Sequence, residues 1–415
     1  MRKATWLLAL ALAFLLGACG GGASPGGGNG GGGGGDGGNG GGGEPTVTVT
    51  AAGAKAAAYR IGNGAWEAAA DPTSFSFTVS GGGPYDVALR CNARDLSLYS
   101  LTTDELTDLD SPCDSGANNI AFSVDYDVSG VQNAKAALLF HKGSVFEGER
   151  AIGTSGTFKV THGVAGEQDL VVLALDGNNP PNVLAAKMAT FTVADKGSYT
   201  VPALSGGDSV GSATFPDFSG EVPSGYKPAW TVFSITPKKT APLSGFGENS
   251  GGTGSTYFTY PFADYLIYMA GAEKTDYSVF SFFASASGTP AITLPGPIDP
   301  AASGSPISVS GLVTASDLLG YVITASWNGT YHLDASISKA YLGSDTSYTL
   351  PDLSSISGFE NTKPATGDTV NVSIVAMRSN MSIAEFSELG KSRLTSMPAG
   401  RYLKIAQKET SYKAP

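Results

Sequence analysis

Residues 120–131, with the sequence IAFSVDYDVSGV, decide the fold class of this chain. Apolar and polar side chains alternate from Ile120 to Asp127, and a period of two residues is the period of a β-strand with one buried face. The strand is expected to end at the tripeptide Val128-Ser129-Gly130, because glycine and serine favour turns. The tripeptide pattern returns at intervals of 90 and 91 residues, as Phe218-Ser219-Gly220 and Val309-Ser310-Gly311, each followed shortly by a valine.

The same order of apolar runs accompanies each copy of this pattern, and a degenerate copy, TVTVTAAG, occupies 46–53. Turns that contain glycine, proline or asparagine separate the runs, and Asn-Gly is a strong hairpin signal. The second run lies at 54–61, 134–141, 228–235 and 320–327, the third at 74–79, 157–161, 256–260 and 347–350, and the fourth at 85–91, 168–175, 263–270 and 368–377.

These repeats predict an all-β protein of tandem Greek-key β-sandwich modules that follow a glycine-rich tether. A helical period of 3.6 residues is not sustained anywhere, and the best helix candidates are 382–394 and 102–109. The rival architecture is a β-propeller, whose typical repeat is about half as long as the interval found here.

The organisation predicted from this pattern has six segments. Residues 1–18 form a signal peptide, and 19–45 hold a lipidated cysteine and the tether. The four modules are 46–118 (module 1, with a disulfide loop), 119–205 (module 2), 206–300 (module 3) and 301–415 (module 4).

The N-terminus has the features of an export signal. Arg2 and Lys3 precede eleven apolar residues, 6–16. This segment is too short to span a hydrocarbon core of about 30 Å, so it is interpreted as a cleavable signal. Residues 20–43 then contain eighteen glycines among twenty-four residues. Such a composition buries no apolar surface and predicts a flexible spacer.

The apolar segment ends in Leu16-Gly17-Ala18-Cys19, which resembles the lipobox of bacterial lipoproteins. The resemblance implies that a diacylglyceryl group is attached to the Cys19 thiol, so that membrane lipid is the first expected partner. It also implies a lipid-anchored protein of the cell envelope, and Gly20 in place of Asp favours the outer membrane or the cell surface over the inner membrane. The alternative is an ordinary secretory signal with a chance cysteine.

The modules themselves resemble immunoglobulin-like and carboxypeptidase-regulatory-like β-sandwiches. The resemblance is carried by the V-S-G-x-V opening, the later S-[GY]-[TF]-x-[VL] run and the final D-[VL]-x-V strand. It covers most of residues 46–412. The Cys…Trp…Cys spacing and the tyrosine corner of antibody domains are missing, so the resemblance implies the sandwich architecture and no more.

Charge and cysteine content narrow the possible partners and the compartment. The net charge of −11 repels phosphate backbones, so nucleic acid is not expected as a partner. Apart from Cys19, the chain has Cys91 and Cys113. In an oxidising compartment such an isolated pair is expected to form a disulfide. A metal site is the alternative, but it needs further soft ligands, and no histidine precedes His141.

Weak candidates for ligand binding come from aromatic and acidic side chains. Module 3 holds a group of tyrosines, and an exposed row of their rings would offer a platform for a glycan or an envelope protein. The alternative is that these rings fill the core, because tyrosine favours strands. The four candidates are Tyr257, Tyr260, Tyr265 and Tyr268. Asp125 and Asp127 imitate the start of a calcium loop, but Ala136 stands where a closing glutamate is required.

No motif for catalysis has its required context, so neither a cofactor nor an enzymatic activity is expected. Gly207-Asp208-Ser209-Val210-Gly211 matches the G-x-S-x-G nucleophile elbow, but it lies in a Gly/Ser-rich seam between β modules. The predicted function is a structural, adhesive or binding role in the cell envelope. The alternatives are a carbohydrate-binding lipoprotein that uses the module 3 tyrosines, and a hydrolase.

Overall fold

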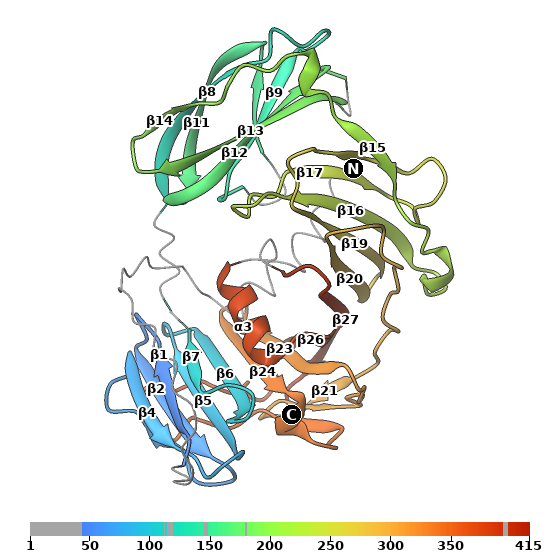
Figure 1. The fold of residues 1–415 in the computed structure, drawn as a ribbon. Helices are drawn as coiled ribbons and strands as arrows, with labels where there is room; N and C mark the ends of the chain where they lie inside the picture. Colours follow the sequence, from blue (N-terminus) through green and yellow to red (C-terminus); the bar gives the residue numbers. More distant parts are fainter. Residues whose placement is uncertain (1–43, 112, 114–118, 145–147, 179–180, 393–396) are drawn as a thin grey trace, which may run out of the picture. The chain divides into compact units, whose positions relative to one another are not determined.

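The computed structural model describes residues 44–111, 113, 119–144, 148–178, 181–392 and 397–415, and the described chain is all-β (Figure 1). The predicted fold class is therefore confirmed. Every apolar run singled out in the sequence overlaps a strand, because alternating side chains allow one face of each strand to be buried while the other meets solvent.

Module 1 has two sheets, with the strand orders β4-β1-β7 and β3-β2-β5-β6. The fourth strand lies antiparallel beside the first, and the seventh lies parallel to it on the other side. The bounds are β1 (Thr46–Thr50), β2 (Ala56–Ile61), β3 (Glu67–Ala68), β4 (Ser74–Thr78), β5 (Pro84–Arg90), β6 (Asp95–Thr102) and β7 (Asp108–Asp110).

Module 2 repeats this topology strand for strand, with the orders β11-β8-β14 and β10-β9-β12-β13. Its first strand again pairs antiparallel with the fourth and parallel with the seventh. The bounds are β8 (Ile120–Asp127), β9 (Ala136–Phe140), β10 (Glu149–Ile152), β11 (Ser155–Gly163), β12 (Gly166–Leu175), β13 (Val183–Val193) and β14 (Ser198–Thr200).

Modules 3 and 4 keep the first six strands of the pattern. In module 3 the orders are β15-β18 and β17-β16-β19-β20. The bounds are β15 (Gly211–Thr214), β16 (Lys227–Ile235), β17 (Leu243–Gly247), β18 (Thr256–Thr259), β19 (Tyr265–Lys274) and β20 (Tyr277–Ser285).

In module 4 the orders are β21-β22-β25 and β24-β23-β26-β27. The bounds are β21 (Ala301–Ser303), β22 (Ser308–Ser310), β23 (Leu318–Trp327), β24 (Tyr331–Ser338), β25 (Ser347–Thr349), β26 (Thr369–Ser379) and β27 (Tyr402–Lys413). The common element order that the sequence predicts is thus present in all four copies.

The three glycines of the V/F-S-G pattern lie between the first and second strands of modules 2, 3 and 4, but they do not form one turn. Gly130 forms a bridge with Ser205, Gly220 lies in a short 3-10 helix, η2 (Ser219–Glu221), and Gly311 has a φ of 76°. The valines that follow differ as well, since Val131 is buried and Val313 is exposed. The recurring tripeptide therefore adopts a different local geometry in each of these three modules.

The helix expectations had mixed outcomes. The segment predicted at 382–394 contains α3 (Ile383–Ser392), which begins at a reciprocal cap between Ser382 and Glu385. The stretch at 102–109 is not a helix. Its Glu105 carboxylate accepts hydrogen bonds from the backbone and hydroxyl of Thr102, and the chain then enters β7.

The chain divides into two compact units. Among the described residues, unit 1 comprises module 2, module 3 up to Pro297, and residues 397–406, which follow α3. Unit 2 comprises module 1 together with Ile298–Ser392 and Gln407–Pro415 of module 4. Two modules that are remote in sequence therefore share unit 2, an arrangement that the linear prediction does not include.

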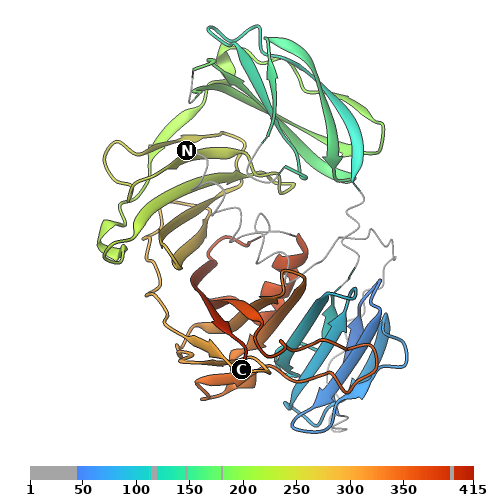
Figure 2. The ribbon, with the colours of Figure 1, turned by 180° about the vertical axis from the view of Figure 1, so that it is seen from behind.

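In unit 2, modules 1 and 4 form one continuous sheet. β6 pairs in parallel with β24, from the His332–Asp95 pair to the Ile337–Ser100 pair. Both views of the ribbon show these two strands side by side (Figure 1, Figure 2). The strand order across the junction is β3-β2-β5-β6-β24-β23-β26. An edge strand of each module is thereby given a partner, which removes two exposed rows of backbone groups.

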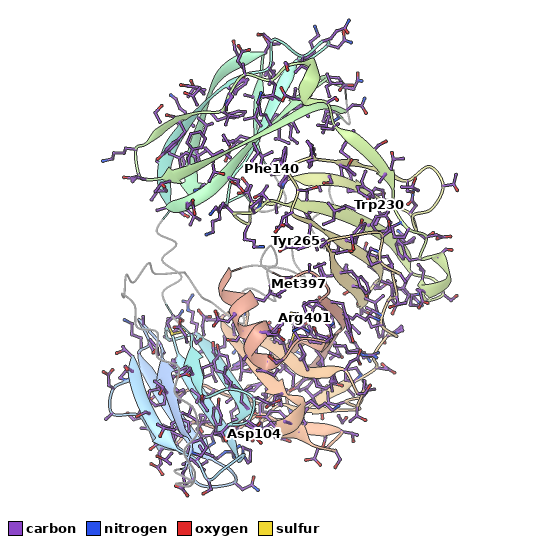
Figure 3. All side chains as sticks on the ribbon, viewed as in Figure 1. Asp104, Phe140, Trp230, Tyr265, Met397 and Arg401 are labelled. Atoms are coloured by element: carbon purple, nitrogen blue, oxygen red, sulfur yellow. A yellow bond between two sulfur atoms is a disulfide. The ribbon has the colours of Figure 1, made fainter. Side chains whose placement is uncertain are left out.

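In unit 1, modules 2 and 3 share an apolar cluster. Strand β12 contains the run LVVLAL (170–175), every side chain of which is buried. Leu170 and Val172 face the core of module 2, whereas Val171 and Leu173 join Phe140 of β9 (Figure 3) and Tyr260 of module 3. A strand buried on both faces loses the polar alternation of a one-sided strand, which explains the continuous apolar run.

Candidate functional site

The best-defined polar cluster lies where modules 1 and 4 meet in unit 2. Asp86 of β5 is fully buried. Arg60 of β2 donates to Asp86 Oδ2 from Nε and Nη2, at 2.8 and 2.7 Å, and the Tyr341 hydroxyl donates to the same oxygen at 2.9 Å. Ser100 donates to Asp86 Oδ1 at 2.6 Å and also bonds Tyr348 at 2.7 Å. The buried charge is therefore paired and fully hydrogen-bonded, as burial requires.

Burial governs the titration of the tyrosines in this cluster. Desolvation, followed by the charge of Asp86, raises the pKa of Tyr341 to about 12. Desolvation likewise raises the pKa of Tyr348. Both phenols remain protonated at neutral pH and act as hydrogen-bond donors, so the cluster joins module 4 to module 1.

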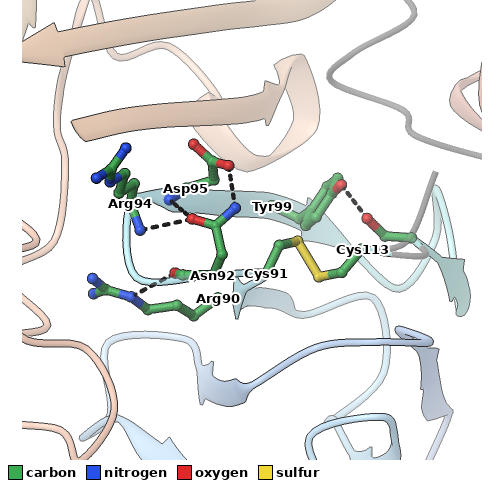
Figure 4. The surroundings of a disulfide bond; sticks show 8 residues. Arg90, Cys91, Asn92, Arg94, Asp95, Tyr99 and Cys113 are labelled. Carbon is green, nitrogen blue, oxygen red and sulfur yellow. Dashed lines mark hydrogen bonds between the residues drawn. A yellow bond between two sulfur atoms is a disulfide. The ribbon is translucent and has the colours of Figure 1, made fainter. Parts of the chain in front are cut away.

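A second connection between the two modules surrounds the Cys91–Cys113 disulfide (Figure 4). Arg90 is buried, and its guanidinium donates to three carbonyl oxygens, those of Asn92, Ala93 and Glu360. Glu360 belongs to module 4, so this arginine joins the β5–β6 turn to the partner module. The predicted disulfide is confirmed, with the two Cα atoms 4.9 Å apart.

The β5–β6 turn borders an open depression of about 510 Å³. Its walls are Asn92, Ala93, Arg94 and Asp95 from module 1, and Gly329, Thr330 and His332 from module 4. The Asn92 side chain shapes the turn, because its Oδ1 accepts the backbone N–H groups of Arg94 and Asp95 (Figure 4). His332 donates its backbone N–H to the Arg94 carbonyl at 2.9 Å, which fixes the two walls to each other.

Asp334 lies two residues beyond His332 on the same face of β24. Its side chain is partly buried, and Oδ1 accepts the Thr324 hydroxyl at 2.8 Å. Desolvation raises the pKa of this carboxyl, and the charge of Asp95 adds to the effect while His332 opposes it. A carboxyl with a raised pKa beside an open depression is a candidate functional group.

The raised pKa of Asp334 predicts a pH-dependent cost to stability. The folded chain keeps a proton that the unfolded chain has released, so stability falls as pH rises from the unfolded pKa of 3.8 through the folded pKa. Asp334→Asn retains the acceptor for Thr324 and removes the charge. We expect this variant to be more stable than the parent at pH 7 in denaturant titrations, and the difference to vanish below pH 3.8. A stability difference that does not change with pH would contradict this reasoning.

A smaller, apolar cavity of about 60 Å³ lies beneath α3 in unit 2. Its walls include Tyr99 of β6, Tyr321 of β23, Met377 of β26 and the α3 residues Ile383 and Phe386. The volume accommodates little more than a small apolar molecule. We interpret it as a packing gap between the sheet and α3.

The four module 3 tyrosines are all buried, so of the two alternatives that the sequence leaves open, the structure shows rings that fill the core and not an exposed row. Tyr257 and Tyr268 hydrogen-bond each other through their hydroxyls at 2.9 Å, and Tyr260 donates to the Leu243 carbonyl at 2.8 Å. Tyr265 lies on β19, which pairs with the Trp230-bearing strand β16 (Figure 3). The ammonium of Lys239 lies over the Tyr265 ring, with Nζ 4.6 Å from the ring centroid. Burial raises the pKa of Tyr260, Tyr265 and Tyr268 above the ordinary 10.0. The rings fill cores because each hydroxyl finds a partner there.

The two weak calcium candidates lie on the partly exposed face of β8. Asp125 accepts the Thr157 hydroxyl at 2.5 Å, and Asp127 accepts the backbone N–H of Ser129 at 2.8 Å. The hydrogen bonds from Ser129 lower the pKa of Asp127. Within the described part of the chain, no group of three His, Cys, Asp or Glu side chains is placed to hold a metal ion. The aspartates shape a strand end and its turn.

The serine of the G-x-S-x-G match follows a short 3-10 helix, η1 (Gly206–Asp208), and precedes β15. A nucleophile elbow has the opposite order, with a strand before the serine and a helix after it. Asp208 instead bonds the backbone and hydroxyl of Ser205 and pairs with Lys187 at 3.2 Å. This geometry belongs to a capped turn between modules 2 and 3.

The predicted lipidation site, Cys19, lies outside the described residues. No helix among the residues that the structure describes has the length and apolar character needed to cross a membrane.

Sequence reasoning missed the residues of the module 1–module 4 junction. Asp86 and Arg90 lie on β5, all of whose residues after Pro84 are buried. A strand that carries two charged residues within an otherwise apolar run was the available signal. It indicates a second buried face with polar partners, although it does not identify those partners.

The described fold and junction define an all-β protein of tandem β-sandwich modules, in which β6 of module 1 pairs with β24 of module 4. No protein-family model matches the chain, and no curated protein matches it. A comparison with solved structures aligns it with the crystal structure of the FN1-FN3 domains of chicken CNTN1. That alignment has 14% sequence identity, covers 61% of this chain and 93% of the other, and has a TM-score of 0.14. The class assignment rests on the strand pairing described above.

Proposed function

We propose that this chain is a lipid-anchored protein of the cell envelope with a structural or binding role, and without enzymatic activity. The observation that carries the proposal is the N-terminal sequence, in which an apolar segment ends at Leu16-Gly17-Ala18-Cys19 and a glycine-rich spacer follows. Two or more acyl chains on Cys19 would give stable anchoring. The Cys91–Cys113 disulfide supports an oxidising compartment.

The arrangement of modules supports a role in presenting surfaces. Strand pairing between β6 and β24 and the buried Asp86 cluster join modules 1 and 4, and the cluster around Phe140 joins modules 2 and 3. Each unit is therefore larger and stiffer than a single sandwich on a linker. Such units hold side chains on sheet faces in fixed positions, which suits binding or scaffolding at the end of a flexible tether.

Cys19→Ser tests the anchor. The variant should leave the membrane fraction or remain unprocessed, and it should lose incorporation of labelled palmitate, because serine offers no thiol for the lipid. Fractionation, labelling and the mass of the mature N-terminus measure these outcomes. Ser24→Ala, five residues further along the chain, is the matched control and should behave as the parent does. A Cys19→Ser protein that is cleaved and remains with membranes like the parent would refute the anchor.

The membrane that holds the anchor is tested separately. Gly20 follows the lipidated cysteine, and in a host with two membranes we propose the outer membrane or the cell surface. Density-gradient separation of inner and outer membranes would locate the parent protein.

A further inference from the structure

Strand register in unit 2 aligns polar side chains in two rows across four strands. The first row is Asp95 of β6, His332 of β24, Ser326 of β23 and Asn371 of β26, and the second row is Ser97, Asp334, Thr324 and Ser373 of the same strands. Residues two apart on a strand share a face, so the eight side chains form one surface. We call these eight residues the polar face.

Several groups on the polar face are available to a ligand. Within the described chain, the side chains of Ser97, Ser326, His332 and Asn371 make no hydrogen bond to one another or to a neighbour. His332 and Asn371 are exposed, and the other six residues are partly buried. The depression beside the β5–β6 turn opens at the Asp95 and His332 end of the first row. A ligand can therefore reach both the rows and the adjoining wall.

The chemistry of the face favours a polyhydroxylated ligand. Serine, threonine, asparagine and histidine each donate and accept hydrogen bonds, and the two carboxylates add strong acceptors. Hydroxyl groups on a sugar also donate and accept, so each can pair with this set. Asp95 and Asp334 are the only charged side chains among the eight apart from the histidine, so they disfavour an anionic sugar, and Arg94 lines the adjoining depression.

Other macromolecules fit the polar face less well. Both β24 and β23 are paired on each side, so a peptide cannot add to them as a further strand. The eight residues include no apolar anchor for a peptide side chain. The overall charge of −11 opposes a nucleic acid.

We propose that the polar face binds an uncharged glycan through its hydroxyl groups, with the β5–β6 turn as one wall of the site. The proposal rests on the cell-envelope location proposed above, because glycans surround a protein tethered there.

The test uses the full-length chain in detergent micelles on an array of uncharged oligosaccharides, with a peptide array alongside. A dissociation constant for the best glycan is then measured by calorimetry. His332→Ala and Asn371→Ala remove exposed side chains that make no described hydrogen bond, so both variants should fold, as their melting temperatures would show. The double variant should bind at least tenfold more weakly. Arg150→Ala, an exposed change on β10 of module 2, is the control and should leave the affinity unchanged.

Three outcomes would overturn the proposal. In the first, the parent protein binds no oligosaccharide on the array. In the second, the parent and the double variant bind the glycan with equal affinity. In the third, the parent binds peptides on the peptide array and the double variant does not. Failure of the anchor is separate, because it appears in the fractionation of Cys19→Ser and leaves glycan binding by purified protein unaffected. If the parent protein is anchored to membranes but binds no glycan, only the proposed glycan site is refuted.

Discussion

Replacing Asp86 with alanine should lower the free energy of unfolding of unit 2 by about 3–5 kcal/mol. The change removes a fully buried carboxylate that accepts from Arg60, Tyr341 and Ser100. Those donors lose their partner, and the Arg60 guanidinium, whose side chain is 22% exposed, retains a largely desolvated charge. The loss should fall on module 1 and module 4 together, because the cluster contains residues of both.

Hydrogen exchange followed by mass spectrometry measures this effect segment by segment. Protection should fall in β5, β6 and β24 and stay unchanged in module 2. Lys363→Ala is the matched control in the same unit, since its pair with Asp352 is solvent-exposed and such pairs contribute about 0–1 kcal/mol. If Asp86→Ala and Lys363→Ala cost the same, the cluster does not hold the two modules together.

Replacing Phe140 with alanine should destabilise unit 1 by about 3–5 kcal/mol, the range for deleting a buried aromatic ring. Phe140 is 1% exposed and lies in the cluster that contains Val171 and Leu173 of module 2 and Tyr260 of module 3. The cavity left by the ring would open on the contact between two modules, so each should lose stability. Denaturant unfolding and hydrogen exchange of β12 and β18 report the two sides of the contact.

Phe246→Ala provides the control for Phe140→Ala. Phe246 is 57% exposed on the edge strand β17, so its removal should change stability by no more than about 0.5 kcal/mol. A Phe140→Ala variant in which only module 2 loses protection would show that the cluster is part of one core and does not join the modules.

Much of the fold could be predicted because the relevant signals are local. Alternation in runs such as TVTVT of β1 and IAFSVDYD of β8 reports which side chains face a core within the same module. Their recurrence in a constant order predicted the four copies, and Cys91 and Cys113 predicted their own bond. Each signal depends on neighbouring residues or on one pair with no competing partner.

The candidate site could not be predicted in the same way. Asp95 and His332 are 237 positions apart, and they become neighbours only because β6 and β24 pair in parallel. The hydrogen bonds that pair two strands join backbone groups, so the side chains of β6 and β24 do not specify which strand each will pair with. The module 3 tyrosines show the same difficulty, because a tyrosine ring suits either an exposed row or a core in which its hydroxyl has a hydrogen-bond partner. For Tyr257 that partner is the hydroxyl of another tyrosine, Tyr268, which the fold brings next to it.

The sequence alone determined the class of secondary structure, the order of the four recurring strand runs in each copy, and the disulfide. The tertiary structure decided which modules associate. The continuous burial of β5 and β12 shows the physical reason. One face of each strand packs in its own module according to a local period, whereas the other face is buried only when a distant segment covers it. Buried charges such as Asp86 are tolerated there because that segment supplies their hydrogen-bond partners.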